Sequence, residues 1–332
     1  KNKVQLYCNQ VFITDQLDGV IPEFMQLLHG VIDSPDIPLN VSRSFLQSDA
    51  SVKKISAHIS KKVSDKLEEM FKNDREDFEK KWEDIKIFIQ YGSITDEKFW
   101  DRAKSFFLLK NVEGKYFTLD EYKTYIETLQ KDKNETLVYL YAADAEKQHI
   151  YIQSAQERGY DVLLMDSILD AHFINMLEQK LEKSKFARVD ADVIDKLIEK
   201  EDSLISKLSE EERKNLSEIF ENSVEKEKFT VVVESLNDTD LPVMIMQNEF
   251  MRRFQDMERL SGQNGMYGRF EHYNLVVNDN NEVIVNLLKE EDAEKKSQMT
   301  QQLVDLALLS QNMLTGEKLS QFVRRSLDFI AK

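Results

Sequence analysis

The sequence has 332 residues, a formal net charge of −16 at neutral pH and 41% hydrophobic residues. Its acidity excludes a general nucleic-acid binder, because contact with the phosphate backbone requires a basic surface. At roughly 100–200 residues per domain, this length predicts two or three domains, each with a buried core. Four prolines and nine glycines exclude a collagen-like or low-complexity chain and favour long helices.

Compartment and membrane association follow from the distribution of apolar residues and cysteine. No apolar run reaches the about 18 residues of a membrane span, and no signal peptide opens the sequence. The single cysteine, Cys8, cannot form an internal disulfide, which fits a reducing compartment. We therefore expect a cytoplasmic protein that binds neither membranes nor nucleic acid. Because Lys1 is followed at once by a strand-like segment, we interpret the chain as a piece of a longer protein.

The first part of the chain predicts a strand followed by helices. Residues 4–14 are rich in β-branched and aromatic side chains and predict one strand. Pro22 favours the start of a short helix that ends near Leu28. A longer helix is predicted from Arg43 toward Phe71, and residues 50–130 keep apolar side chains at three- and four-residue steps.

The pattern then changes to short apolar strands that alternate with helices. Residues 137–143 and 161–165 are almost wholly apolar, with a helical segment at 144–158 between them. A helix at 168–181 leads to a third strand at 186–189. Buried strands joined by helices predict a small, mostly parallel sheet covered on both faces.

The last part predicts a second mixed region. Residues 195–228 carry dense charge of both signs and predict a solvated connector with the first helix of a new domain. Strands are predicted at 228–235, 242–246 and 273–277. Two apolar-striped helices follow between 291 and 331, broken at Thr315–Gly316.

The sequence shows no motif of a complete catalytic, nucleotide-binding or metal site. The chain has no phosphate-binding glycine loop, no dinucleotide-binding glycine pattern and no nucleophile elbow. Its five histidines are scattered without the spacing of zinc ligands. The residues alone therefore indicate a multidomain protein of α/β and α+β class, with no metal or cofactor held by this chain.

Residues 11–47 contain the runs VFITD, IPEF and HGVIDSPDIPLNVSRSFLQ. This stretch resembles the middle-domain signature of the heat shock protein 90 family. Eukaryotic cytosolic members carry a long acidic tail that this sequence lacks, so the resemblance is to the bacterial type. The resemblance implies the end of a large middle αβα subdomain with a helical connector at 1–132 and a small αβα subdomain at 133–200. It further implies a C-terminal α+β dimerisation domain at 201–332, while the ATP-binding domain of the family has no counterpart here.

The resemblance also assigns a role to the loop that carries Arg43. In the family, the arginine of this loop contacts the γ-phosphate of ATP held by the preceding domain, and Asn40 and Gln47 match its supporting polar residues. A guanidinium suits this task because it offers fixed donors and a permanent charge. The full-length protein is thus expected to be an ATPase that uses ATP and Mg, whereas this chain alone is not expected to be catalytic. The alternative is a solvated residue in a helix first turn, where the helix dipole disfavours a cation.

A second implied role is contact with unfolded or partly folded client proteins. Relatives expose an apolar short helix toward the cleft between protomers, and methionine and aromatic side chains suit adaptable contacts. The matching residues are Phe250, Met251, Phe254, Met257 and Leu260, with His172 and Phe173 as further candidates. The alternative for the first five is ordinary core packing, and for His172 we favour an ordinary helix-surface residue.

A third implied role is homodimerisation through the two C-terminal helices. In the family, two such hairpins pair as a four-helix bundle across a two-fold axis. The apolar residues concerned are Leu303, Leu306, Leu309, Leu314, Leu319, Phe322, Val323 and Leu327. Packing on their own domain must account for part of this stripe. Residues 282–288 read as a strand by pattern, but relatives begin a helix there, and we follow the relatives.

Three functions compete at this level. The first is a dimeric chaperone clamp driven by ATP in the full protein. The second is a small-molecule enzyme with a pocket near Asp144 or Asp166 at the strand ends of the small sheet. The third is a scaffolding protein without client-folding activity.

Overall fold

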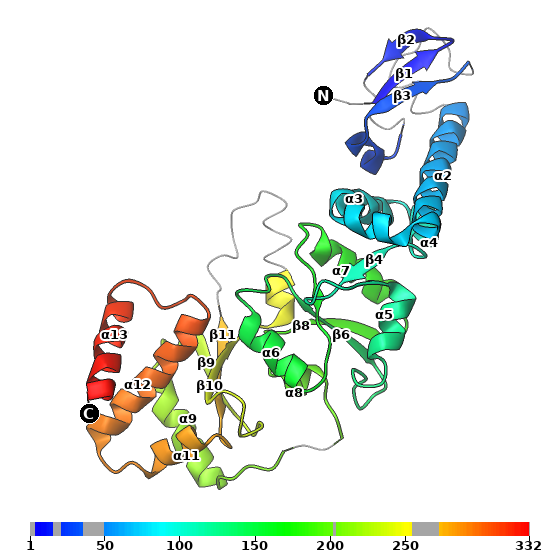
Figure 1. Ribbon diagram of the computed structural model, residues 1–332. Coiled ribbons are helices and arrows are strands. Elements are labelled where there is room, and N and C mark those ends of the chain that lie inside the picture. The colour runs from blue at the N-terminus through cyan, green and yellow to red at the C-terminus, as the bar shows by residue number, and fades with distance from the viewer. Residues whose placement is uncertain (1–3, 16–20, 36–49, 202–203, 254–271, 332) are drawn as a thin grey trace. The chain divides into compact units, whose positions relative to one another are not determined.

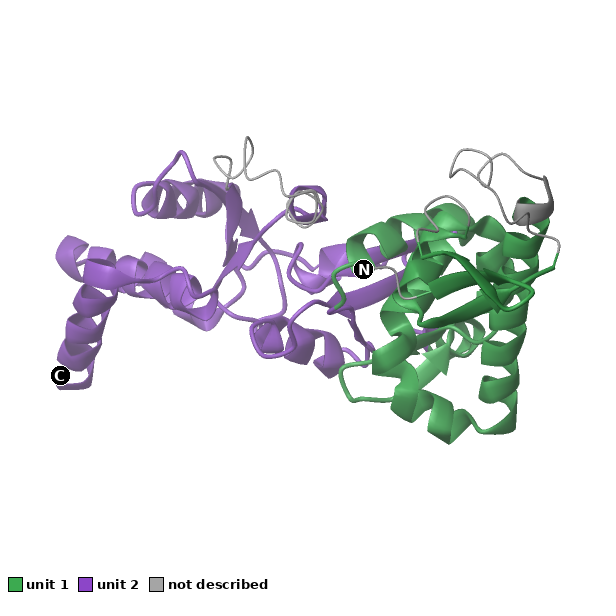
Figure 2. Cartoon of the chain, turned by 90° about the horizontal axis from the view of Figure 1, so that it is seen from above, with its two compact units in different colours: residues 1–125, 167–182 green, residues 126–166, 183–332 purple. Residues whose placement is uncertain are grey.

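The computed structural model describes residues 4–15, 21–35, 50–201, 204–253 and 272–331 (Figure 1). The chain forms two compact units, residues 1–125 with 167–182 and residues 126–166 with 183–332 (Figure 2). Both units combine helices with small sheets, so the mixed α/β, multidomain class predicted from the sequence is confirmed. The three predicted domain ranges stay a prediction.

Unit 1 begins with a small mixed sheet of order β2-β1-β3. The strands are β1 (Val4–Cys8), β2 (Val11–Thr14) and β3 (Gly30–Asp33). The prediction of a single strand for residues 4–14 was wrong. Two strands form instead, because Asn9 and Gln10 have φ values of 47° and 65° and reverse the chain. Asparagine tolerates this left-handed conformation better than most residues. Buried Val4, Leu6 and Cys8 alternate with more exposed neighbours, as expected for a strand with one covered face.

The rest of unit 1 is largely helical. The short helix predicted after Pro22 is a 3₁₀ helix, η1 (Glu23–Leu27), and the described part of the next predicted helix begins at Ala50. The α-helices are α2 (Ala50–Asn73), α3 (Arg75–Thr95), α4 (Glu97–Ala103), α5 (Leu119–Ile126) and α7 (Asp170–Lys180). A two-stranded sheet, β4 (Leu108–Lys110) and β5 (Tyr116–Thr118), precedes α5. Thr118 and Glu121 exchange hydrogen bonds of 2.8 and 3.3 Å at its start, which makes a reciprocal cap.

Aromatic rings join the helices of unit 1. The Phe24 ring of η1 lies 5.3 Å from that of Phe88 on α3 and 4.7 Å from that of Phe99 on α4. The Phe99 and Phe24 rings pack directly over the backbone at Gly92. A Cβ atom there would lie 2.8 Å from the Phe99 ring, so a larger residue would force the rings apart.

Unit 2 contains the predicted parallel sheet, of order β7-β6-β8. The strands are β6 (Leu137–Ala142), β7 (Leu163–Leu164) and β8 (Ser184–Arg188). Every residue of β6 is buried, as expected for the central strand of a covered parallel sheet. Helix α6 (His149–Glu157) starts later than predicted, because the Gln148 side chain accepts hydrogen bonds from the amides of Ala143 and Asp144.

The second sheet of unit 2 has the order β10-β11-β9. Its strands are β9 (Phe229–Glu234), β10 (Val243–Met246) and β11 (Tyr273–Asn278). Strand β11 is central, parallel to β9 and antiparallel to β10. The helices of this part are α8 (Ile194–Leu197), α9 (Glu210–Glu221), α11 (Glu282–Lys289), α12 (Ala293–Ser310) and α13 (Gly316–Ala331).

One apolar core lies between the second sheet and its helices. It includes Phe220 of α9, Leu275 of β11, Ile284 of α11 and Val304 of α12, which expose 2% of their surface or less. The helix expected at 282–288 is confirmed, and so is the break between α12 and α13. Asn281 caps α11 by accepting a hydrogen bond from the Val283 amide.

Candidate functional site

Among the described residues, no three His, Cys, Asp or Glu side chains come together in a way that could hold a metal ion. Asp144, a candidate for an enzyme site, accepts hydrogen bonds from the amides of Glu146 and Lys147 and pairs with the Lys147 ammonium. These contacts give its carboxylate a structural task. Arg43, Asn40 and Gln47 lie outside the described residues.

The segment that carries Phe250 is fastened to the parallel sheet by its polar side chains. Glu249 accepts a 2.6 Å hydrogen bond from the Tyr141 hydroxyl of β6 and a 2.9 Å bond from the Arg188 amide of β8. Arg253 donates to Glu249 and, at 2.7 Å, to the carbonyl of Phe186. Burial and the neighbouring Glu249 carboxylate raise the pKa of Tyr141 well above its usual value, so its hydroxyl stays a hydrogen-bond donor.

Arg252 fastens the same segment at a second point. It forms a salt bridge with Asp190, whose side chain is almost fully buried just beyond β8, and donates a 2.7 Å hydrogen bond to Gln247. Residues 249–253 are helical, and the Asn248 side chain caps them by accepting from the Phe250 amide. The two arginines therefore fix which face of this short helix turns toward the sheet.

Phe250 lies on the other face, with 72% of its surface exposed, and Met251 is partly buried. The exposure of Phe250 is not what ordinary core packing, the alternative, would give. Phe254, Met257 and Leu260, predicted to continue the same stripe, lie outside the described residues. The structure thus describes the first two of these five residues, and one of them, Phe250, has most of its surface exposed.

The other proposed client residues lie on α7 in unit 1. His172 is exposed, whereas Phe173 is completely buried. The Phe173 ring stacks on Phe107 at a centroid distance of 4.5 Å and meets Trp100 edge-on at 6.1 Å. In this conformation Phe173 packs inside unit 1 and offers no surface to a partner.

The C-terminal hairpin divides the predicted dimer residues into two groups. Leu303, Leu314 and Phe322 are buried, and Leu319 is partly buried. Arg325 fixes α13 on α12 through a salt bridge with Asp305 and a 2.8 Å hydrogen bond to Gln302. The group that stays exposed consists of Leu306, Leu309, Val323 and Leu327, which show 40–60% of their surface. We call these four residues the hairpin stripe.

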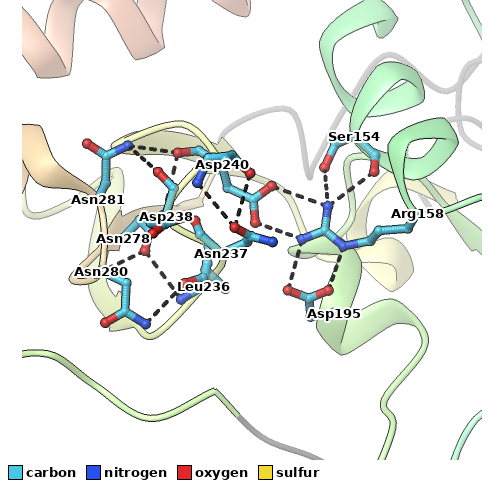
Figure 3. A network of polar contacts seen from close by, with 11 residues as sticks. Ser154, Arg158, Asp195, Leu236, Asn237, Asp238, Asp240, Asn278, Asn280 and Asn281 are labelled. Carbon is cyan, nitrogen blue, oxygen red and sulfur yellow. Dashed lines mark hydrogen bonds and ion pairs between the residues drawn. The ribbon is translucent and has the colours of Figure 1, made fainter.

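A polar network joins the parallel sheet region to the second sheet, and Figure 3 shows it at close range. At the end of α6, the Arg158 guanidinium makes two hydrogen bonds to Asp195, of 2.7 and 3.0 Å, and two to Asp240, of 3.2 and 2.7 Å. It also donates to the Ser154 hydroxyl at 3.1 Å. Burial acts to lower the pKa of Arg158, but the hydrogen bonds to Asp240 and Asp195 outweigh it and raise the pKa above its usual value.

The loop that carries Asp240 is held in turn by asparagines at and just after the end of β11, of which Asn278 and Asn280 are buried. Asn278 donates to the Asn237 carbonyl at 2.8 Å, and Asn281 donates to the Asp240 carbonyl at 2.9 Å (Figure 3). Asn280 reaches the Leu236 carbonyl at 3.1 Å. The sequence analysis singled out neither Arg158 nor these asparagines. A run of four amide and acid side chains directly after a buried strand was the available signal, because such groups need partners inside the protein.

The comparisons with known proteins agree on one family. The family model described as Hsp90 protein matches residues 1–327. The chain is 43% identical to the chaperone protein HtpG of Bacteroides fragilis over 99% of its length and 44% identical to that of Porphyromonas gingivalis over 98%. Over the full length of this chain, it is 26% identical to the chaperone protein HtpG of Borreliella burgdorferi.

These two units of mixed helices and small sheets define a multidomain α+β protein. The chain belongs to the heat shock protein 90 family, with bacterial HtpG chaperones among its relatives. It spans 58% of the length of the Bacteroides and Porphyromonas relatives, little more than half. Within the described residues, no helix is both long enough and apolar enough to cross a membrane.

Proposed function

We propose that the chain is the middle and C-terminal part of an ATP-dependent molecular chaperone, which acts in the cytoplasm as a dimeric clamp on partly folded proteins. Residues 1–132 and 133–200 would be the two middle subdomains, and residues 201–332 the dimerisation domain. The family match over most of the chain supports this assignment, and its relatives carry the name of chaperones.

The observation that carries the proposal is the exposure of Phe250 on a helix fixed by two arginines. An aromatic ring that is 72% exposed gives up the apolar burial that usually holds it inside a protein. Contiguous exposed apolar patches mark binding surfaces, and methionine neighbours add adaptability. We propose that Phe250 and Met251 begin a client-binding stripe that continues through Phe254, Met257 and Leu260.

Replacement of the exposed ring tests this surface. Phe250→Ser should reduce the ability of the chain to suppress aggregation of a chemically denatured protein, measured by light scattering at a temperature where both proteins are folded. Val31→Ser is the matched control, because Val31 is also strongly exposed, at 68%, but lies in the sheet of unit 1. Equal suppression by both variants and the parent would favour the scaffolding alternative.

We further propose that the hairpin stripe pairs with that of a second copy as a four-helix bundle. The four side chains are apolar and solvent-exposed, while polar contacts hold α13 on α12. Val323→Asp with Leu327→Asp should give a monomer in sedimentation experiments at concentrations where the parent is a dimer. Val283→Asp, at a similarly exposed site on α11, should stay dimeric. A monomeric parent would end the clamp model.

The loop of Arg43 is assigned to ATP hydrolysis by resemblance. We propose that Arg43 contacts the γ-phosphate of ATP, with Mg, on a nucleotide domain, and that Asn40 and Gln47 support it. Adding such a domain to the chain should raise ATP turnover, and Arg43→Ala should abolish the increase. Arg324→Ala, at an exposed position of α13, is the control. Equal turnover by the parent and the Arg43→Ala variant would remove the assigned role.

A further inference from the structure

A cavity of about 150 Å³ lies beside the Arg158 network in unit 2. One wall comes from α6 and the start of α8, and the other from β10 and the loop before it. The apolar lining includes Ile150, Val193, Ile194, Leu236, Met244 and Met246. Most of these side chains belong to regions that are close in space but far apart in the sequence.

Two hydroxyl groups in the lining have unused hydrogen-bonding capacity in the described contacts. The Ser154 hydroxyl accepts a bond from Arg158, which leaves its own hydrogen to donate. The Thr239 hydroxyl donates to the Asn237 side chain, which leaves its oxygen to accept. A polar group inside the cavity could therefore both give and receive a hydrogen bond.

The charges around the cavity select against anions. Asp240 in the wall and Asp195 share the single guanidinium of Arg158, which leaves an excess of one negative charge. Glu157 adds a carboxylate among the exposed lining residues, where the cavity meets solvent. An anionic ligand would meet repulsion, whereas a neutral or cationic one would not.

We propose that this cavity binds a small neutral aromatic molecule that carries one hydroxyl or N–H group. The volume suits a single ring, since an apolar cavity of about 150 Å³ engineered into another protein binds benzene. Without such a ligand, the hydroxyls favour water. The ring would replace that water against the apolar walls, and its polar group would meet Ser154 and Thr239.

Occupation of the cavity would stabilise the joint between α6 and the loop of Asp240. The reason is that the ligand would contact both walls only while they are together, and a ligand that binds one state shifts the equilibrium toward it. The proposal does not depend on ATP, clients or dimerisation, so it can fail while the chaperone function stands.

Titration of the chain with phenol, followed by ligand-observed NMR, tests the site. For a ligand of seven heavy atoms we expect one saturable site with a dissociation constant on the order of millimolar. Benzoate should bind at least about tenfold more weakly, because like charges oppose it. Leu241→Trp should block phenol, because Leu241 lines the cavity and is partly exposed at its mouth. Val283→Trp, on the exposed face of α11, should bind phenol as the parent does.

A second variant keeps the test independent of that bulky change. Ser154→Ala should weaken phenol about two- to tenfold through the lost hydrogen bond and leave benzene binding unchanged. Ser217→Ala on α9 is its control, since Ser217 bonds only a neighbouring glutamate in the described contacts. No saturable binding, equal affinities for phenol and benzoate, or equal binding of phenol by the parent, Leu241→Trp and Ser154→Ala would overturn the proposal.

Discussion

The aromatic centre of unit 1 and the polar network of unit 2 hold their elements together by different means. Around Phe173 of α7, the rings of Trp100 on α4 and of Phe107, just before β4, pack against it. Around Arg158, directed hydrogen bonds join elements that are up to 82 residues apart in the sequence. Apolar packing is non-directional and depends on volume, whereas the network depends on each partner being present. Substitutions should therefore act through lost volume in the aromatic centre and through charges left without a partner in the polar network.

The largest effect is expected in the aromatic centre. Phe173→Ala removes a fully buried ring and should destabilise unit 1 by about 3–5 kcal/mol, because the cavity cannot refill. Trp82 and Trp100 are the two tryptophans of the sequence and both lie in unit 1, so fluorescence during urea unfolding reports on that unit. His172→Ala, at the exposed neighbour, should change stability by less than about 0.5 kcal/mol. Similar midpoints for both variants would contradict the burial of Phe173.

The second largest effect is expected in the polar network around Arg158. Arg158→Ala leaves Asp195 and Asp240 without their shared cation, and should weaken the joint by about 2–3 kcal/mol, less than a fully buried pair since Asp195 is 38% exposed. Hydrogen exchange of the amides of α6 and of residues 236–241 measures this local loss. Arg158→Lys keeps the charge but loses the forked geometry, so it should fall between the parent and alanine. If lysine and alanine behave alike, geometry rather than charge dominates the network.

A smaller effect is expected from added volume. Gly92→Ala places a methyl group 2.8 Å from the Phe99 ring and should destabilise unit 1 by about 1–2 kcal/mol through forced displacement of the rings. Tryptophan fluorescence again measures the transition. Gly30→Ala is the matched control, because a Cβ atom at Gly30 meets nothing within 4 Å. A stabilised Gly92→Ala protein would mean that the aromatic centre has room to adjust.

The smallest effect concerns pH. A hydrogen bond from Arg75 lowers the pKa of Glu121 below its usual value. A carboxylate whose pKa is lowered in the folded state stabilises the protein at pH values above its ordinary pKa. That contribution disappears as the pH falls through the lowered pKa. Glu121→Gln should therefore make unit 1 less sensitive to acid, by less than about 1 kcal/mol because Glu121 is 44% exposed. The measurement is urea unfolding at neutral pH and near pH 3, with the exposed Glu76→Gln as control.

Periodic apolar patterns made much of this fold predictable. The almost wholly apolar run 137–143 predicted the central parallel strand β6, and the three- and four-residue apolar steps after residue 50 predicted the helices of unit 1. These features are local, since the residues that determine them are neighbours in the sequence. The reversal at Asn9 and Gln10 was missed, because β-branched residues on both sides of it continue one strand-like pattern.

The candidate site was less predictable. Phe250 belongs to a stripe whose spacing alone favours core packing, and its exposure follows from Arg252 and Arg253 meeting the distant β6–β8 sheet. Likewise, the partners of Arg158 come from α8 and from the loop before β10. A single sequence does not reveal which charged residues meet across such separations. The role of Arg43 rests on resemblance.

The two arginines that hold residues 249–253 have a consequence for variation in this family. Turning this helix to hide the ring would draw both guanidinium groups away from their carboxylate and carbonyl partners. A substitution at position 250 therefore leaves in place the arginine contacts that orient this helix. Under the proposed client-binding role, a change at this position would alter the contacted surface and keep the orientation of the helix.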